Sequence, residues 1–195
     1  AYNLPQGVIT HMYRDIAAHN IGTITHVGLN TFVDPRHGGG KLNERTKEDL
    51  VKLVNIEGEE RLLYKPIPID VCLVRGSYAD EYGNCTVHRE IGPLDVTAQC
   101  QATKNSGGIV IVQVEKLLQG GTLDPRLVKI PGIYVDAIVV GAPEDNNQCL
   151  GMAYDGALSG EFRIPMDDIP PIPMDAKKII ARRAAMELPQ DAIVN

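Results

Sequence analysis

The chain has 195 residues, of which 44% are hydrophobic and 23% charged, and its formal net charge is -6. These values are ordinary for a globular protein. The negative charge argues against a nucleic-acid partner, which needs a basic surface. No apolar run approaches the roughly 18 residues of a membrane span, so we expect no membrane partner either.

The four cysteines and five histidines are spaced too irregularly to indicate a metal site. Neither a CxxC nor an HExxH pattern occurs, so we expect no bound metal. Cys72 and Cys100 lie in apolar stretches and are interpreted as core residues. Disulfides are not expected at this size and composition, which predicts a reducing, cytoplasmic location.

The first predicted elements are a short strand and a helix that meet in the stretch NLPQG. Residues 3–5 have the pattern of a strand end, Pro5 suits the first turn of a helix, and residues 8–19 repeat apolar side chains at helical spacing. Such a corner at the carboxyl end of a parallel strand often binds ligands in α/β folds. Gln6 is therefore either a ligand-binding residue or a solvent-facing turn residue, and the pattern leaves both open.

A strand is predicted at residues 23–29, followed by a long glycine-rich loop at residues 31–43. Its HGGGK sequence is not a phosphate-binding Walker loop, because Lys41 is followed by Leu42 and no strand-loop-helix context surrounds it. Long loops in compact domains are commonly functional. We interpret this one as a flexible loop, of the kind that covers a ligand.

The middle of the chain alternates predicted strands and helices. Residues 50–65 are predicted to form a hairpin around a Glu-Gly turn, and residues 69–76 a central parallel strand, because they are apolar on both faces. A helix is expected from Pro93 to about residue 104. Buried strands are expected at residues 109–114 and 133–140. This alternation predicts an α/β fold with a mostly parallel sheet.

Two acidic residues flank predicted buried strands. Asp70 leads into one strand and Glu115 follows another. Acids at strand ends are usually solvated, but buried ones can be functional. Both interpretations stay open for these two residues.

The composition changes near the C-terminus. Residues 160–173 hold four prolines and are predicted to be a semi-rigid linker, and a helix capped by Asp175 follows. Residues 192–195 are predicted to begin a strand. We therefore expect a chain truncated at both ends, with a first α/β domain at 1–160, a linker at 161–174 and the start of a second α/β domain at 175–195.

These stretches, taken together, resemble the family I coenzyme A transferases of the acetate/propionate type, which fuse both halves in one polypeptide. The resemblance is carried by NLPQGVITHMYRDIAA at 3–18, THVGLNTFVDPRHGGGKLN at 25–43, PIDVCLVRGSYADEYGN at 68–84, NSGGIVIVQVE at 105–115 and KIPGIYVDAIVV at 129–140. It implies a three-layer α/β/α fold with an open, mostly parallel sheet. It also implies transfer of CoA from a short-chain acyl-CoA, such as acetyl-CoA or propionyl-CoA, to a carboxylic acid.

The implied mechanism is ping-pong and passes through a glutamyl-CoA thioester, a form of covalent catalysis by a carboxylate. CoA is the cosubstrate, and no bound cofactor is expected. The resemblance places the nucleophilic glutamate after Asn195 and a Gly-rich loop before Ala1, so no catalytic nucleophile is expected in this chain and the chain alone is not expected to turn over. We also expect a homo-oligomer and contacts with the second half.

The resemblance further implies which residues bind the substrate. Gln6 matches the glutamine of the family's PQG motif, whose amide would stabilise a developing oxyanion. Asn30 departs from the glycine that is usual at its position, which leaves the acyl preference open. The full expected set is Gln6, Gly7, Gly28, Asn30, Thr31 and Phe32.

Two other functions stay possible at this stage. One is an acyl-CoA hydrolase of the same family, in which water replaces the acceptor acid. The other is a non-catalytic ligand-sensing module, since one α/β architecture serves many functions.

Overall fold

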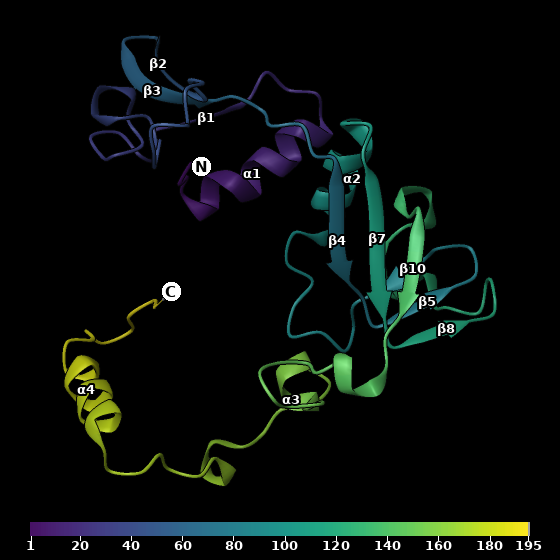
Figure 1. The fold of residues 1–195 in the computed structure, drawn as a ribbon. Coiled ribbons are helices and arrows are strands. Elements are labelled where there is room, and N and C mark those ends of the chain that lie inside the picture. Colours follow the sequence, from purple (N-terminus) through teal and green to yellow (C-terminus); the bar gives the residue numbers. More distant parts are fainter. Residues whose placement is uncertain (195) are drawn as a thin grey trace. The chain divides into compact units, whose positions relative to one another are not determined.

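The computed structural model describes residues 1–194, which divide into two compact units, the first spanning Ala1–Glu161 and the second beginning at Phe162 (Figure 1). The α-helices are α1 (Gln6–Ala17), α2 (Val96–Asn105), α3 (Gly156–Ser159) and α4 (Ala176–Ala185). The strands are β1 (Thr23–Thr25), β2 (Val51–Ile56), β3 (Glu59–Tyr64), β4 (Val71–Arg75), β5 (Tyr78–Asp80), β6 (Cys85–Thr86), β7 (Ile109–Val114), β8 (Lys116–Leu118), β9 (Val128–Ile130) and β10 (Ala137–Val140). The assignment of these units to the predicted domains and linker stays a prediction.

A parallel sheet with the strand order β10-β7-β4 forms the centre of the first unit. Figure 1 shows its three strands running the same way. In the strand register, Leu73 lies opposite Ile111, and Ile111 lies opposite Ala137. The predicted α/β class with a parallel sheet is confirmed. Within the described residues β7 is the central strand, whereas the sequence pattern had placed residues 69–76 in the middle.

One face of the parallel sheet is buried against α2. Cys72, Val74, Val110 and Val112 pack with Cys100 of α2 in a single cluster, and burial of this apolar surface is the main force holding the layers together. The cysteines are free thiols, as predicted for core residues.

The opposite face of the sheet exposes apolar side chains. Val71, Leu73, Ile109 and Val139 alternate with the buried set and are all exposed. Within the first unit, Ala1–Glu161, helices therefore cover one side of this sheet.

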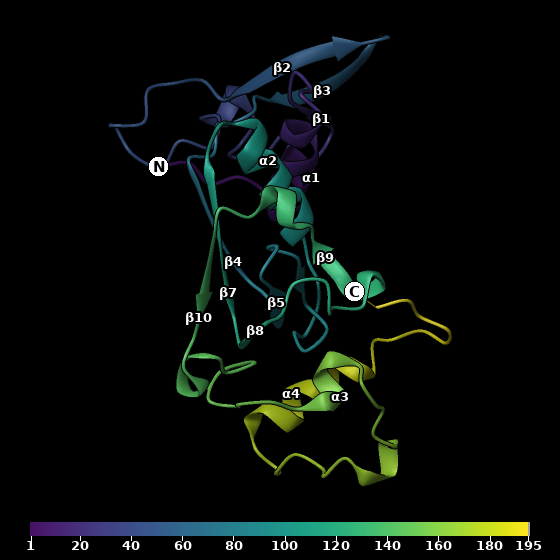
Figure 2. The ribbon, with the colours of Figure 1, turned by 90° about the vertical axis from the view of Figure 1, so that its right-hand side faces the viewer.

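A second, antiparallel sheet has the order β1-β3-β2 and carries α1. Val8, Met12 and Ile16 share one stripe of α1 and pack with Leu62 and Tyr64 of β3. The amphipathic helix and the hairpin are thus confirmed. Figures 1 and 2 both show α1 beside α2, so the two helices join the two sheets.

The third sheet has the order β8-β5-β6-β9, and Asp80 organises the turn that joins β5 to β6. Asp80 is buried and accepts hydrogen bonds from the N–H groups of Tyr82, Asn84 and Gly121. The Asn84 side chain donates to the same carboxylate and accepts from the N–H of Gly132. Burial raises the pKa of Asp80, but these bonds outweigh it and the net pKa is lowered.

Several predicted boundaries were wrong near the N-terminus. Residues 3–5 form no strand, because only an isolated bridge joins Tyr2 to Lys41, and the helix begins at Gln6 with Pro5 as its N-cap. The strand predicted at 23–29 ends at Thr25, since the chain then enters a series of turns. The corner that holds Gln6 therefore does not follow a parallel strand within the described residues.

Two further boundaries moved because of local backbone geometry. The helix expected from Pro93 begins at Val96, after Leu94 adopts a φ of 43° that no helix allows. The strand expected at 133–140 is shortened to β10, preceded by a 3₁₀ helix at Gly132–Tyr134.

The second unit holds α4, whose predicted cap is confirmed by the Asp175 side chain accepting from the N–H of Lys178. A 3₁₀ helix at Met166–Asp168 interrupts the Pro-rich stretch, which the sequence pattern had assigned no regular structure. Residues 192–194 form no strand, and Asn195 lies outside the described residues. No helix in residues 1–194 has the length and apolarity that crossing a membrane requires.

Candidate functional site

The first two predicted site residues occupy the first turn of α1. Gln6 and Gly7 are both exposed, and the Gln6 side chain makes no hydrogen bond within residues 1–194. The carbonyl of Pro5 accepts from the N–H groups of Val8 and Ile9 at 3.0 and 3.1 Å. Because the first N–H groups of a helix have no intrahelical acceptor, this turn presents donors and the positive end of the helix dipole.

The other predicted residues lie in the turn that follows β1. Gly28 has a φ of 101°, and a Cβ added there would lie 2.4 Å from the Tyr64 hydroxyl and 2.4 Å from Val33. The Tyr64 hydroxyl donates to the carbonyl of Val27 at 2.8 Å, and burial raises its pKa to about 12. Only glycine fits this position without strain.

Asn30 occupies a left-handed backbone conformation, with a φ of 61°. Glycine adopts this conformation most easily, and asparagine tolerates it better than most residues. The departure from glycine is therefore accommodated by the backbone. The Asn30 side chain is exposed, as are Thr31 and Phe32.

The loop after these residues is organised around one buried carboxylate, Asp34. It accepts from the N–H groups of Asn30 and Arg36, both at 3.0 Å, and from the Arg36 guanidinium at 3.0 and 2.7 Å. Asp34 is fully buried, whereas Arg36 remains 40% exposed and also pairs with Glu60. The hydrogen bonds from Arg36 hold the pKa of Asp34 well below its usual range.

The glycine-rich end of this loop is held by backbone hydrogen bonds and an ion pair, and its flexibility stays a prediction. Gly39 and Gly40 are buried, and the carbonyl of Gly40 accepts from the N–H of Asn3 at 2.9 Å. Lys41 pairs with Asp49. These contacts hold the loop against the N-terminal segment that leads into α1.

A cleft of about 420 Å³ lies between α1 and β1 and continues to Val27, the neighbour of Gly28. Gly7 lines this cleft, and so does Val27 from the turn after β1. The other predicted site residues, Gln6, Gly28, Asn30, Thr31 and Phe32, do not line it. The lining residues are Gly7, Val8, His11, Asp15, Thr23, Ile24, Thr25 and Val27.

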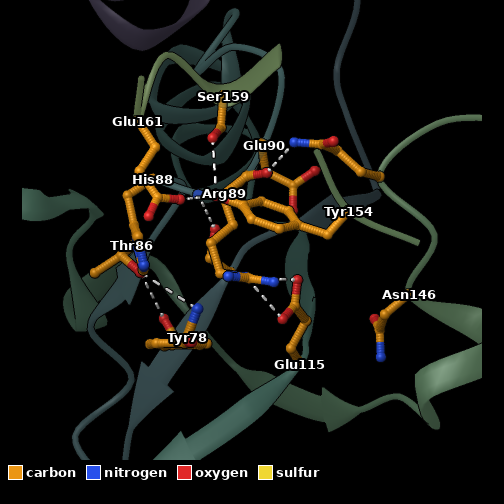
Figure 3. A network of polar contacts seen from close by, with 12 residues as sticks. Tyr78, Thr86, His88, Arg89, Glu90, Glu115, Asn146, Tyr154, Ser159 and Glu161 are labelled. Carbon is orange, nitrogen blue, oxygen red and sulfur yellow. Dashed lines mark hydrogen bonds and ion pairs between the residues drawn. The ribbon is translucent and has the colours of Figure 1, made fainter. Parts of the chain in front are cut away.

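A second polar region, which we call the edge network, lies at the carboxyl ends of the parallel strands (Figure 3). Glu115 directly follows β7, and Arg89 donates to its carboxylate through Nε at 3.0 Å. The Arg89 guanidinium also lies 3.6 Å from the centre of the Tyr154 ring, a cation–π geometry. A cleft of about 320 Å³ adjoins these three side chains.

The edge network continues through histidine and hydroxyl groups. Nδ1 of His88 lies 2.9 Å from the Thr86 hydroxyl, and the Tyr154 hydroxyl shares hydrogen bonds with Ser159 and Glu161. Burial, followed by the nearby Arg89 charge, lowers the pKa of His88. The imidazole is therefore held toward its neutral form.

The edge network attaches the segment 142–161 to the sheet. Arg75, at the end of β4, donates to the carbonyls of Asn146 and Asn147. The Gln148 amide donates to the carbonyl of Arg89 at 2.8 Å and accepts from the N–H of Asp155 at 2.8 Å. Because these charges already have protein partners, we assign this region an anchoring role.

Sequence reasoning had flagged only one member of the edge network, Glu115, through its position after a buried strand. The contacts of the edge network join residues that lie far apart in the chain. Arg75 and Asn147, for example, contact each other and are 72 residues apart. The other acid flagged beside a strand, Asp70, is exposed. Within residues 1–194 no group of three or more His, Cys, Asp or Glu side chains has an arrangement that could hold a metal ion.

The fold and the α1 corner define an α/β protein with an exposed first helix turn beside a cleft, and comparisons with known proteins specify its class. The family model described as Coenzyme A transferase matches residues 1–141. The chain belongs to the coenzyme A transferase family.

Two curated relatives match nearly all of the chain. It is 52% identical to the "Caffeate CoA-transferase" of Acetobacterium woodii, covering 98% of this chain and 37% of the relative. It is 43% identical to the "Acetate CoA-transferase YdiF" of Escherichia coli O157:H7, covering 100% of this chain and 36% of the relative. The chain thus spans about a third of the length of these relatives.

Solved structures agree with this assignment. The acyl-CoA transferase YdiF of Escherichia coli O157:H7, solved as a thioester complex with CoA, superposes with a TM-score of 0.85 at 44% identity, over 96% of this chain and 37% of that one. Glutaconate coenzyme A-transferase of Acidaminococcus fermentans superposes with a TM-score of 0.62 at 19% identity, over 81% of this chain and 51% of that one, and so supports the fold alone.

Proposed function

We propose that the protein carrying this chain transfers CoA from an acyl-CoA to a carboxylic acid. The observation that carries the proposal is the exposed Gln6 at the start of α1, with no protein partner for its side chain within residues 1–194, in a chain of the coenzyme A transferase family. Short-chain acids of the acetate and propionate type are the proposed substrates. The relative named for acetate supports this choice, whereas the relative named for caffeate points to a larger acid.

The proposed reaction passes through a glutamate located outside residues 1–195. Its carboxylate attacks the thioester carbonyl of the donor, forming a mixed anhydride and releasing the CoA thiolate. The thiolate then attacks the glutamyl carbonyl, which gives the enzyme-CoA thioester and the free donor acid. The acceptor carboxylate reverses these two steps, so that every bond broken is balanced by one formed.

Gln6 has a defined part in this proposal. Each attack places negative charge on a carbonyl oxygen, and a preorganised amide N–H stabilises that charge more strongly than it stabilises the neutral carbonyl. The first turn of α1 adds the positive end of a helix of 12 residues. Gly7, Gly28, Asn30, Thr31 and Phe32 are proposed to surround the acyl group.

The test uses the full-length protein that carries this chain. After incubation with acetyl-CoA, mass spectrometry is expected to find CoA bound as a thioester to one glutamate, and adding propionate is expected to release propionyl-CoA. Release of free CoA without an acceptor would instead identify a hydrolase. Absence of both the adduct and any CoA release would favour a ligand-sensing module.

A further inference from the structure

We propose that residues 33–42 form a brace that sets the spacing between Gln6 and the turn at residues 28–32, with Asp34 and Gly40 as its positioning residues. This inference rests on the proposed function, in which Gln6 stabilises the oxyanion and the turn surrounds the acyl group. Asp34 and Gly40 act through these groups and do not touch the substrate. The inference is supported by a series of backbone hydrogen bonds, by the partners of a buried carboxylate and by a close contact at Gly40.

The brace joins the two parts of the proposed site through backbone hydrogen bonds. The N–H of Gly40 donates to the carbonyl of Phe32 at 3.0 Å, and the carbonyl of Gly40 accepts from the N–H of Asn3 at 2.9 Å. Phe32 belongs to the turn, and Asn3 lies three residues before Gln6. Because one residue is bonded to both sides, the turn cannot move away from the start of α1 without breaking one of these bonds.

Asp34 fixes the turn and the glycine-rich part of the brace together. Its Oδ2 accepts from the N–H of Asn30 at 3.0 Å, and its own N–H donates to the carbonyl of Thr31 at 3.0 Å. The first bond holds Asn30 in its left-handed conformation. The carbonyl of Asp34 accepts from the N–H of Gly39 at 3.0 Å. Asp34 is thus bonded to the turn before it and to the residue that precedes Gly40.

Arg36 holds the buried carboxylate in this position. Its guanidinium donates to both oxygens of Asp34, at 3.0 and 2.7 Å, and also pairs with Glu60 of β3 at 3.1 Å. Displacing a buried carboxylate from such a partner is unfavourable. Because β3 belongs to the sheet that packs against α1, Asp34 is anchored to the same part of the molecule as the helix that begins with Gln6.

The contact at Gly40 is too close for any side chain. A Cβ added there would lie 2.9 Å from the carbonyl oxygen of Asn3 and 3.3 Å from the Leu4 side chain. The neighbouring Gly39 is also buried and has a similar φ, 64° against 74°, but an added Cβ there would meet only the Cα of Pro35, at 3.9 Å. The two glycines therefore share a conformation and differ in their contact with the N-terminal segment.

The proposed chemistry requires a fixed spacing because the Gln6 amide stabilises the oxyanion only if the acyl carbon lies beside it. A displacement of about 1 Å can lower the rate about 100-fold, even when its cause lies away from the reacting atoms. Loss of the brace is therefore expected to lower kcat through Gln6. Once Gln6 is removed, the brace is expected to matter much less.

The experiment is a double-mutant cycle in the full-length protein, with acetyl-CoA as donor and propionate as acceptor. Asp34→Asn keeps the size of the side chain but replaces one acceptor oxygen with an NH₂ group. We expect it to lower kcat about tenfold when Gln6 is present and less than about twofold in the Gln6→Ala background. A purely structural role would lower the amount of folded enzyme by the same factor in both backgrounds, so equal factors would overturn the inference.

The two glycines give a second test that does not depend on the carboxylate. Gly40→Ala is expected to lower kcat about tenfold, because the methyl group displaces Asn3. Gly39→Ala is the matched control, since alanine adopts the same strained conformation there without that contact, and its kcat is expected to stay within about twofold of the unmodified value. Equal losses of kcat in the two variants would contradict the positioning role of Gly40.

The outcomes also distinguish this inference from the proposed function. An unmodified protein that transfers no CoA, or a Gln6→Ala variant that keeps its kcat, would overturn the proposed function and the brace with it. A Gln6→Ala variant that loses kcat, together with Asp34→Asn and Gly40→Ala variants that keep it, would overturn the brace alone.

Discussion

The tripeptide Asp-Pro-Arg occurs twice in this chain, and the two copies have the same local structure in different surroundings. At both Asp34 and Asp124, the carboxylate caps a 3₁₀ helix and binds the backbone N–H and guanidinium of the arginine two residues later. Asp34 is fully buried, whereas the Asp124 side chain is 34% exposed. The motif therefore fixes the local conformation, and burial decides how much the surrounding structure depends on it.

The edge network lies between these two extremes. In its Arg89–Glu115 pair the side chains are 25% and 23% exposed. Ion pairs at a surface contribute little, whereas removing one member of a buried pair is costly. The three sites thus form a series in which the same kind of contact is expected to contribute different amounts to the free energy of unfolding.

The largest expected effect comes from straining the backbone turn at Gly28, which precedes the buried copy in the chain. Gly28→Ala places a methyl group against Tyr64 and Val33 and forces alanine into a left-handed conformation. We expect a loss of about 3 kcal/mol in the free energy of unfolding. Urea denaturation measures it.

The control is Gly121→Ala, close to the exposed copy. Gly121 also has a positive φ, of 78°, but an added Cβ there would meet only a Tyr82 ring atom at 3.8 Å. We expect a loss of about 1 kcal/mol from backbone strain alone. Equal losses in the two variants would show that the packing around Gly28 is not what requires glycine.

The next effect compares the two carboxylates directly. Asp34→Asn leaves Arg36 without its main partner, and we expect a loss of about 2 kcal/mol, below the full cost of a buried pair because Arg36 is partly exposed. Asp124→Asn is expected to cause a clearly smaller loss, because an exposed ion pair contributes little to stability. Urea denaturation of both variants at neutral pH tests the contrast, and similar losses would contradict it.

The pH dependence sharpens the same contrast. The folded-state pKa of Asp34 is lowered, so its contribution to stability is complete above the unfolded value of about 3.9 and is lost as the pH falls toward the folded pKa. We expect the stability difference between the unmodified protein and Asp34→Asn to shrink as the pH falls below about 4. A difference that stayed constant would show that the charge of Asp34 is not responsible.

An effect between those of the buried and exposed copies is expected in the edge network. Arg89→Met keeps much of the side-chain volume but removes the ion pair with Glu115 and the charge over the Tyr154 ring. We expect a loss of about 1 kcal/mol. A double-mutant cycle with Glu115→Gln isolates the pair, and a coupling energy of zero would remove Glu115 from the anchoring contacts.

Some parts of this molecule could be predicted from sequence because their determinants are local. The α1 stripe, the Glu-Gly hairpin and the Asp175 cap each depend on residues a few positions apart. The resemblance carried by NLPQG and the following stretches identified the family. It could not show that Asn30 fits because its backbone is left-handed, which depends on the turn around Asp34.

Other parts depend on contacts that no local pattern reveals. The edge network joins Arg75, Arg89, Glu115 and Tyr154, which the topology brings together only after three parallel strands align. The cleft between α1 and β1 depends on the packing of the helix against the antiparallel sheet. The strand predicted before Gln6 was wrong because a short polar-apolar alternation there forms only one bridge, to Lys41.

The most direct test of the account is the turnover of a Gln6→Ala variant of the full-length protein with acetyl-CoA and propionate. If Gln6 stabilises the developing oxyanion, kcat is expected to fall about 100-fold, while the free energy of unfolding stays unchanged because Gln6 is exposed. Arg89→Met, in the edge network, is expected to show the reverse, with reduced stability and retained kcat. A Gln6→Ala variant that keeps its kcat would contradict the placement of the reaction at the α1 corner.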